Sequence, residues 1–364
     1  MILDLCAGPA GWDMGARILG LAEPIHGYDI DADACNTART AGFLRTQKSV
    51  TDLDPEDFPN ATGLIASPPC PTFSRSGKQS AVRGEDPEAI RDGIVRLGDS
   101  QAGLGPDDAY TDAYGRVSDM RTALVLEALR FGLRLPNLQW LVAEQVPAVH
   151  DIWTEMAAEL AAAHDFESCH VVTVEAEDVG LASRRRRVFL IATRETTPEV
   201  GNLPIQTWWS CGRFESPRVH MTTAGPLFPP VSMARALGWP AGERINTRGA
   251  RKTSGGNEFT CDKPSWCLTE KARSWKRVSD GAQLTAAQAG LLTGFPADYP
   301  WQGSRSKQFL QAADVVSPPV AAAVLGAALG VPWEAPVRDY LTDLYPAGVD
   351  APGVFQPSLF EEVA

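Results

Sequence analysis

A cysteine between prolines is the first candidate for chemistry in this sequence. Cys70 stands in the segment Pro68-Pro69-Cys70-Pro71 and follows the apolar run 62–66, which predicts a short strand buried on both faces. The prolines end that strand and hold the cysteine on a stiff turn, where a nucleophile would be well placed. Most buried cysteines only fill space in a core, so the thiol alone does not identify a site.

Two further charged positions adjoin predicted buried strands. Glu144 ends the apolar run 139–143 and precedes Pro147, where a carboxylate is costly to bury unless it has a use. Arg185 and Arg187 precede the apolar run 188–192 and are two residues apart, so their side chains would share one face of a strand. A solvated basic surface or a phosphate-binding patch would also explain the basic run 184–187.

The first thirty residues have the pattern of a nucleotide site. Residues 1–5 predict a strand, 6–11 a turn of small residues and 12–21 an apolar helix. Such a turn lets backbone N–H groups approach a ligand at the start of a helix. A second predicted strand, 25–28, ends in Asp29-Ile30-Asp31, and a carboxylate there can accept hydrogen bonds from ribose hydroxyls. For Asp31, capping of the next helix is at least as good an explanation.

Together these segments resemble the cytosine-C5 DNA methyltransferase family, in the family's order and over most of the chain. The family's opening turn is matched by residues 4–11, its Pro-Cys nucleophile motif by 69–74 and its Asp-x-Arg by 119–121. Residues 144–146 resemble its Glu-Asn-Val, and residues 183–187 resemble its Gln-x-Arg-x-Arg. The segments 284–296 and 315–319 are similar to the last two family motifs.

The resemblance implies that the Cys70 thiolate adds to carbon 6 of a cytosine swung out of the DNA helix, so that carbon 5 can accept a methyl group from S-adenosylmethionine. It implies that Glu144 hydrogen-bonds ring nitrogen 3 and the exocyclic amine, while Arg185 and Arg187 hold the cytosine oxygen and orient Glu144. An ordinary thiol has a pKa of about 8.5, so the Cys70 anion needs help from the loop or from basic neighbours. The implied cofactor-binding residues are Asp4, Leu5, Cys6, Ala7, Gly8, Gly11, Asp29, Ile30 and Pro69.

Several positions depart from the family pattern. Cys6 replaces an aromatic residue whose contact area a thiol cannot supply, so we expect altered cofactor affinity or a substitute contact from Trp12. Pro71 replaces a glutamine, Gln145 an asparagine and Ala313-Asp314 a Gly-Asn pair. None of these changes removes the thiol, the carboxylate or the arginine pair, which predicts a divergent but active enzyme.

The composition limits the class of protein. Hydrophobic residues make up 44% of the 364 residues, and no apolar run approaches the roughly 18 residues of a membrane span, so sizeable cores and no membrane association are expected. Without a basic-then-apolar leader, the predicted location is the cytoplasm of a bacterium or of a phage-infected host cell. Seven cysteines, an odd number with no C-x-x-C pair, argue against a disulfide framework and against a metal site.

Alternating strand and helix patterns predict an α/β fold: a Rossmann-like, mostly parallel sheet with helices on both faces, plus a small irregular target-recognition domain. The expected division is a catalytic domain at 1–193, a target-recognition domain at 194–280, a segment completing the catalytic domain at 281–330 and an acidic, proline-containing tail at 331–364. Tryptophans in the second interval are more often a small core than platforms for bases.

The net charge of −12 opposes DNA binding overall, but the charge is unevenly distributed. The interval 194–280 holds 13 Lys or Arg against 8 Asp or Glu, whereas residues 1–60 hold 4 against 10. One basic face is enough for phosphate contacts, so duplex DNA is the expected partner. The expected DNA-binding residues are Ser74, Ser76 and Lys78 in the loop after the nucleophile, and Arg244, Arg248, Arg251 and Lys252 in the recognition interval.

Two alternatives to a DNA methyltransferase stay open. One is a tRNA cytosine-C5 methyltransferase of the same catalytic plan, and the other is a DNA-binding relative without activity. The interval of more than 80 residues for target recognition favours DNA. A cognate restriction endonuclease is a candidate partner whose existence the sequence does not decide, and we expect the enzyme itself to be a monomer.

Overall fold

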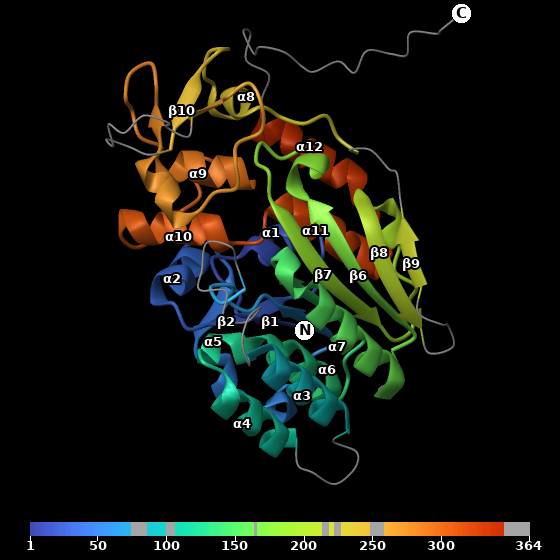
Figure 1. Cartoon of the computed structure of the whole chain (residues 1–364). Helices are drawn as coiled ribbons and strands as arrows, with labels where there is room; N and C mark the ends of the chain where they lie inside the picture. The colour runs from blue at the N-terminus through green and yellow to red at the C-terminus, as the bar shows by residue number, and fades with distance from the viewer. Residues whose placement is uncertain are drawn as a thin grey trace, which may run out of the picture.

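A nine-stranded sheet forms the middle of the molecule in this computed structural model, and a separate three-stranded sheet lies beyond one end of it (Figure 1). The structure describes residues 1–73, 86–99, 106–163, 166–212, 218–221, 227–247 and 258–345. The large sheet has the order β3-β2-β1-β4-β5-β7-β6-β8-β9, and the small one β11-β10-β12. The strands of the large sheet are β1 (Ile2–Leu5), β2 (Ile25–Asp29), β3 (Leu44–Gln47), β4 (Gly63–Ala66), β5 (Trp140–Gln145), β6 (Ser168–Glu175), β7 (Arg186–Thr193), β8 (Ile205–Gly212) and β9 (Arg218–Met221).

Helices cover both faces of the large sheet, which confirms the predicted α/β class (Figure 1). The alternation of strand side chains divides the interior into two cores, since Ile2 of β1 belongs to one core and Leu3 to the other. The first core includes residues of α1 (Gly11–Leu19), α8 (Met233–Leu237), α9 (Ala286–Thr293), α10 (Arg305–Asp314), α11 (Pro318–Leu329) and α12 (Glu334–Leu344). The second includes residues of α3 (Asp86–Gly98), α4 (Pro106–Arg116), α5 (Met120–Ala123), α6 (Glu127–Arg134) and α7 (His150–Ala163).

The end of the chain packs against its beginning. An added Cβ at Gly15 of α1 would lie 2.6 Å from the Cβ of Ala321 in α11, so only glycine allows the two helices to approach this closely. The stretch Arg305–Leu329, which contains α10 and α11, is the one described helical stretch long and apolar enough to span a membrane. Because 89% of its most apolar window is buried inside the protein, it is explained as part of the core.

The direction of β7 differs from that of its neighbours. Strands β1 to β5 are parallel to one another, so their carboxyl ends meet at one edge of the sheet. Strand β7 is antiparallel to both β5 and β6, with Gln145 opposite Val188. The beginning of β7 therefore lies at the same edge as the end of β5, and this brings distant charged residues together.

The interval predicted for target recognition contributes to both sheets. Strands β8 and β9 continue the large sheet beyond β6. The small sheet consists of β10 (Arg244–Asn246), β11 (Glu258–Thr260) and β12 (Lys276–Arg277). Trp275 is buried against Phe259, as the prediction of a core favoured, whereas Trp266 stacks on Phe259 with ring centroids 4.8 Å apart and remains 39% exposed.

A buried cluster of charged side chains packs beside the turn that follows β1. The Nη2 atom of Arg45 on β3 lies 2.7 Å from a carboxylate oxygen of Asp13, and its Nη1 atom lies 4.0 Å from Asp4. Burial raises the pKa of Asp4, while Arg45 opposes that rise. The guanidinium occupies the space in which a Cβ of residue 27 would stand, so Gly27 is required for this arrangement.

Replacing Arg45 with methionine is expected to lower the free energy of unfolding by about 3–5 kcal/mol, because two buried carboxylates would lose their cation. Chemical denaturation would measure the loss. Arg96→Met removes an arginine whose side chain is 45% exposed, and it should cost less than about 1 kcal/mol. Equal stability of the two variants would contradict a supporting role for Arg45.

Candidate active site

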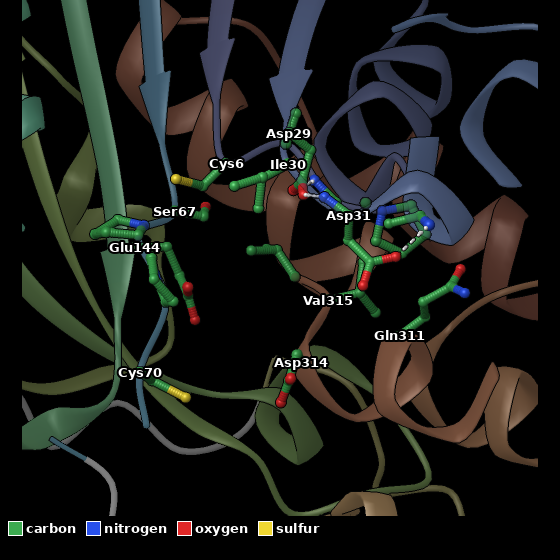
Figure 2. Close-up of a pocket in the computed structure, with 18 of the residues that line it drawn as sticks. Cys6, Asp29, Ile30, Asp31, Ser67, Cys70, Glu144, Gln311, Asp314 and Val315 are labelled. Atoms are coloured by element: carbon green, nitrogen blue, oxygen red, sulfur yellow. Dashed lines mark hydrogen bonds between the residues drawn. The ribbon is translucent and has the colours of Figure 1, made fainter. Parts of the chain in front are cut away.

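One cavity of about 430 Å³ joins the first turn of the chain to the cysteine loop (Figure 2). It lies at the carboxyl edge of the parallel strands, which is where ligands bind in open α/β sheets. Its volume is in the range of small-molecule and cofactor sites. Of the residues predicted from the sequence, it is lined by Cys6, Ala7, Gly8, Gly11, Asp29, Ile30, Pro69, Cys70, Glu144 and Arg187.

The turn after β1 has an unusual backbone. Cys6 and Ala10 have positive φ angles of 56° and 79°, although neither is glycine, and Gly8 has a φ of 52°. Such conformations cost energy in L-residues and often occur where a backbone is shaped around a ligand. The N–H of Gly8 donates a hydrogen bond of 2.8 Å to Asp29, so the turn is tied to the end of β2.

The two aspartates after β2 have separate partners. Asp29 accepts hydrogen bonds from the backbone N–H groups of Gly8 and Asp31, each at 2.8 Å, which fixes its carboxylate at the wall of the cavity. Asp31 caps α2 (Ala32–Thr40) through Asp33 and Ala34, so the capping role is confirmed. Its other oxygen lies 2.6 Å from Nζ of Lys307, yet Asp31 also lines the cavity.

Three residues near the start of the chain do not lie where the sequence analysis expected them to contact the cofactor. Asp4 and Leu5 are buried beneath the turn, outside the lining of the cavity, and Asp4 faces Arg45. Trp12 does line the cavity but is only 1% exposed, with its Nε1 donating to Ser67 Oγ at 2.8 Å. Its role in the structure is therefore to join α1 to the loop that carries Cys70.

Glu144 and Arg187 form an ion pair beside the cysteine. Arg187 Nε lies 2.8 Å from Glu144 Oε1, and their side chains are 14% and 7% exposed. The pairing exists because β5 ends and the antiparallel β7 begins at the same edge of the sheet. Burial raises the pKa of Glu144, and Arg187 opposes that rise. A carboxyl that holds its proton more firmly suits a hydrogen-bond or proton donor.

Cys70 lies on the floor of the same cavity and is half-buried. Burial is the main cause that raises its pKa to about 11, with Asp314 adding to the rise and Arg187 opposing it. The thiol is thus largely protonated at neutral pH in the free protein. The side chain of Gln145 donates a 2.7 Å hydrogen bond to the Pro68 carbonyl, which braces the loop carrying the cysteine.

Arg185 does not share the position of Arg187. It is buried outside the lining of the cavity, and its guanidinium donates to the carbonyls of Ala313, Asp314 and Val315 at the end of α10. The expectation that the two arginines share one face assumed that both belong to the strand, whereas β7 begins at Arg186. Arg185 therefore holds the backbone of α10, and Arg187 alone contacts Glu144.

Most of the expected DNA-binding residues lie outside the described residues: Ser74, Ser76, Lys78, Arg248, Arg251 and Lys252. Arg244 is described, and it is exposed on β10 with its Nε 3.5 Å from Glu258.

Sequence reasoning missed part of the cavity wall. Val50, Leu124, Leu310 and Gln311 line the cavity from elements far apart in the chain. The three apolar residues and Gln311 carry no signal in the sequence, because only the fold brings them to one place. Asp314 was noted only as a departure from the family pattern, yet it also lines the cavity.

The chain is similar to known methyltransferases over most of its length. Residues 1–89 match the family model described as C-5 cytosine-specific DNA methylase. The type II methyltransferase M.AplI of Arthrospira platensis is 24% identical over 332 residues, which are 89% of this chain and 84% of that protein.

Solved structures share the fold. A putative DNA modification methyltransferase encoded within an E. coli prophage superposes with a TM-score of 0.56 at 18% identity, covering 91% of this chain and 98% of the other. The Dnmt2 methyltransferase of S. pombe superposes with a TM-score of 0.58 at 14% identity, covering 90% and 98%. The family model therefore covers the segment that carries the glycine turn, Asp29 and Cys70, and the solved methyltransferase structures share the fold of the chain as a whole.

Proposed function

We propose that this chain methylates carbon 5 of cytosine in double-stranded DNA, using Cys70 as the nucleophile. The observation that carries the proposal is the single cavity that contains the thiol of Cys70, the Glu144–Arg187 pair and the turn held by Asp29. A nucleophile, a proton donor and a nucleotide-binding turn are the three parts that this reaction requires.

The residues of the cavity fit S-adenosylmethionine. Asp29 and Asp31 offer carboxylates to ribose hydroxyls, and Ile30, which is 71% exposed, offers an apolar surface to a purine ring together with Val50 and Leu124. When bound, the cofactor supplies an electrophilic methyl group on a sulfonium. Cys6 stands where the family has an aromatic residue. The apolar side chains of Ile30, Val50 and Leu124 are therefore the candidates to supply the missing contact with the adenine.

The protein side chains prepare the cytosine to accept that methyl group. The Cys70 thiolate adds to carbon 6, which makes carbon 5 nucleophilic. Glu144 donates to ring nitrogen 3 and so withdraws the charge that develops during the addition. Arg187 orients Glu144 through the 2.8 Å contact and favours the thiolate electrostatically. A base then removes the proton from carbon 5, the carbon–sulfur bond breaks, and the aromatic ring is restored with Cys70 released as the thiolate.

Several observations favour DNA as the substrate. The similar protein from Arthrospira platensis is named a type II methyltransferase, and the solved prophage structure is named a putative DNA modification methyltransferase. The basic balance of the interval 194–280 is suited to phosphate contacts. A cognate restriction endonuclease, a monomeric state and a cytoplasmic location stay predictions from the sequence.

The proposal is tested by offering purified protein and isotope-labelled S-adenosylmethionine to duplex DNA and, separately, to tRNA. Label is expected in DNA alone, and bisulfite sequencing should place it at cytosines in a defined sequence. Duplexes containing 5-fluorocytosine should trap a covalent adduct, which peptide mass spectrometry would assign to Cys70.

Cys267→Ser is the matched control, because Cys267 is exposed and lies outside the lining of the cavity, so the adduct should persist in this variant. Label in tRNA alone would support the tRNA enzyme instead. An absence of both label and adduct would indicate a DNA-binding protein without activity.

A further inference from the structure

Asp314, the last residue of α10, faces the cavity on the side opposite Cys70. Figure 2 shows the carboxylate of Asp314 and the sulfur of Cys70 on opposite sides of the lower part of the cavity. The proximity has an electrostatic effect, since Asp314 raises the pKa of Cys70 more than any other charged neighbour. An uncharged asparagine stands here in the family pattern, so the charge is a property of this chain.

The position of Asp314 is fixed by its backbone rather than by its side chain. Arg185 donates to the carbonyls of Asp314 and Val315 at 3.0 and 2.8 Å, and Arg185 is itself buried. Burial raises the pKa of Asp314, and the nearby charges of Arg185 and Arg187 oppose that rise and favour the carboxylate. The N–H groups of these arginines nevertheless bind elsewhere, because Arg185 donates to the carbonyls and Arg187 Nε faces Glu144. The carboxylate of Asp314 is thus held at the cavity with its oxygens available to a ligand.

The proposed reaction places a positive charge in this part of the cavity. Cys70 bonds carbon 6 of the cytosine while the methyl group reaches the adjacent carbon 5. Asp314 lines the cavity together with Cys70 and the first turn, so its carboxylate would face a methyl donor bound next to the cytosine. After transfer, the sulfur is a neutral thioether and this positive charge is gone.

We propose that Asp314 is the counter-charge for the sulfonium, so that the site prefers S-adenosylmethionine to its product S-adenosylhomocysteine. This inference rests on the proposed function. It has a consequence for the nucleophile, because a bound cation offsets the effect of Asp314 on Cys70. Binding of the methyl donor should then make Cys70 more reactive, whereas binding of the product should not.

Calorimetric titration of the protein with each ligand, in the absence of nucleic acid, tests the preference. In Asp314→Asn, the dissociation constant of S-adenosylmethionine should rise by about tenfold, while that of S-adenosylhomocysteine should change by less than about twofold. Asp314→Glu retains the charge and should retain most of the preference. Thermal melting would show that each variant is folded.

Asp29→Asn is the matched control at the other end of the cavity. Asp29 is proposed to contact the ribose, which both ligands share, so this variant should weaken both to the same extent. A second experiment measures the rate at which iodoacetamide alkylates Cys70, and mass spectrometry identifies the modified peptide. In the wild type S-adenosylmethionine should accelerate the reaction, and in Asp314→Asn this acceleration should be lost.

Two outcomes would overturn the inference and can be told apart. If Asp314→Asn and Asp314→Glu weaken both ligands equally, or weaken neither, Asp314 does not act as a counter-charge although the site binds the cofactor. If the wild type binds neither ligand, the proposed function fails together with the inference.

Discussion

Cys70→Ser is expected to lower the rate of methyl transfer by about 10⁴-fold or more, with the affinity for S-adenosylmethionine unchanged within about twofold. A hydroxyl at this position is a far weaker nucleophile than a thiolate, whereas the turn and Asp29 that would hold the cofactor are untouched. Single-turnover kinetics with a labelled methyl group would measure the rate, and calorimetry the affinity. Retained activity would refute Cys70 as the nucleophile.

Because the pKa of Cys70 is raised, the reactivity of its thiol in the wild type should depend on pH, and Cys70→Ser should lack this dependence. With a pKa of about 11, the thiolate fraction increases about tenfold per pH unit between pH 7 and pH 10. The rate of alkylation of Cys70 in the free protein should increase in the same way. A constant rate over this range would mean that Cys70 is already ionised and that its neighbours stabilise the thiolate.

Local sequence patterns were enough to predict the parts of the site that depend on adjacent residues. Asp31 caps α2 from the position directly before it, and the turn between β1 and α1 follows from small residues between a strand and a helix. Cys70 follows β4 as the apolar run and the prolines predicted. In each case, the residues that decide the structure are neighbours in the chain.

The parts that depend on distant contacts were not predictable in this way. An apolar run shows that β7 is a strand, but it does not show that β7 is antiparallel to β5, and this direction brings Arg187 to Glu144. Arg185 binds carbonyls some 128 to 130 positions further along the chain, so its separation from Arg187 has no local signal. The sequence alone indicates no role for the charge of Asp314, because only the fold places this residue opposite Cys70.

Glu144→Gln is expected to lower kcat by about 10²- to 10³-fold, with DNA and cofactor affinities unchanged within about threefold. Glutamine keeps the size of the side chain and can still form a hydrogen bond, but it has no proton to give to ring nitrogen 3. Glu175→Gln is the matched control, because Glu175 pairs with Arg186 at 2.9 Å, one residue from Arg187, and lies outside the lining of the cavity. It should leave kcat unchanged within about twofold. A loss of DNA affinity in Glu144→Gln without a loss of kcat would show that Glu144 holds the base and does not take part in the proton transfer.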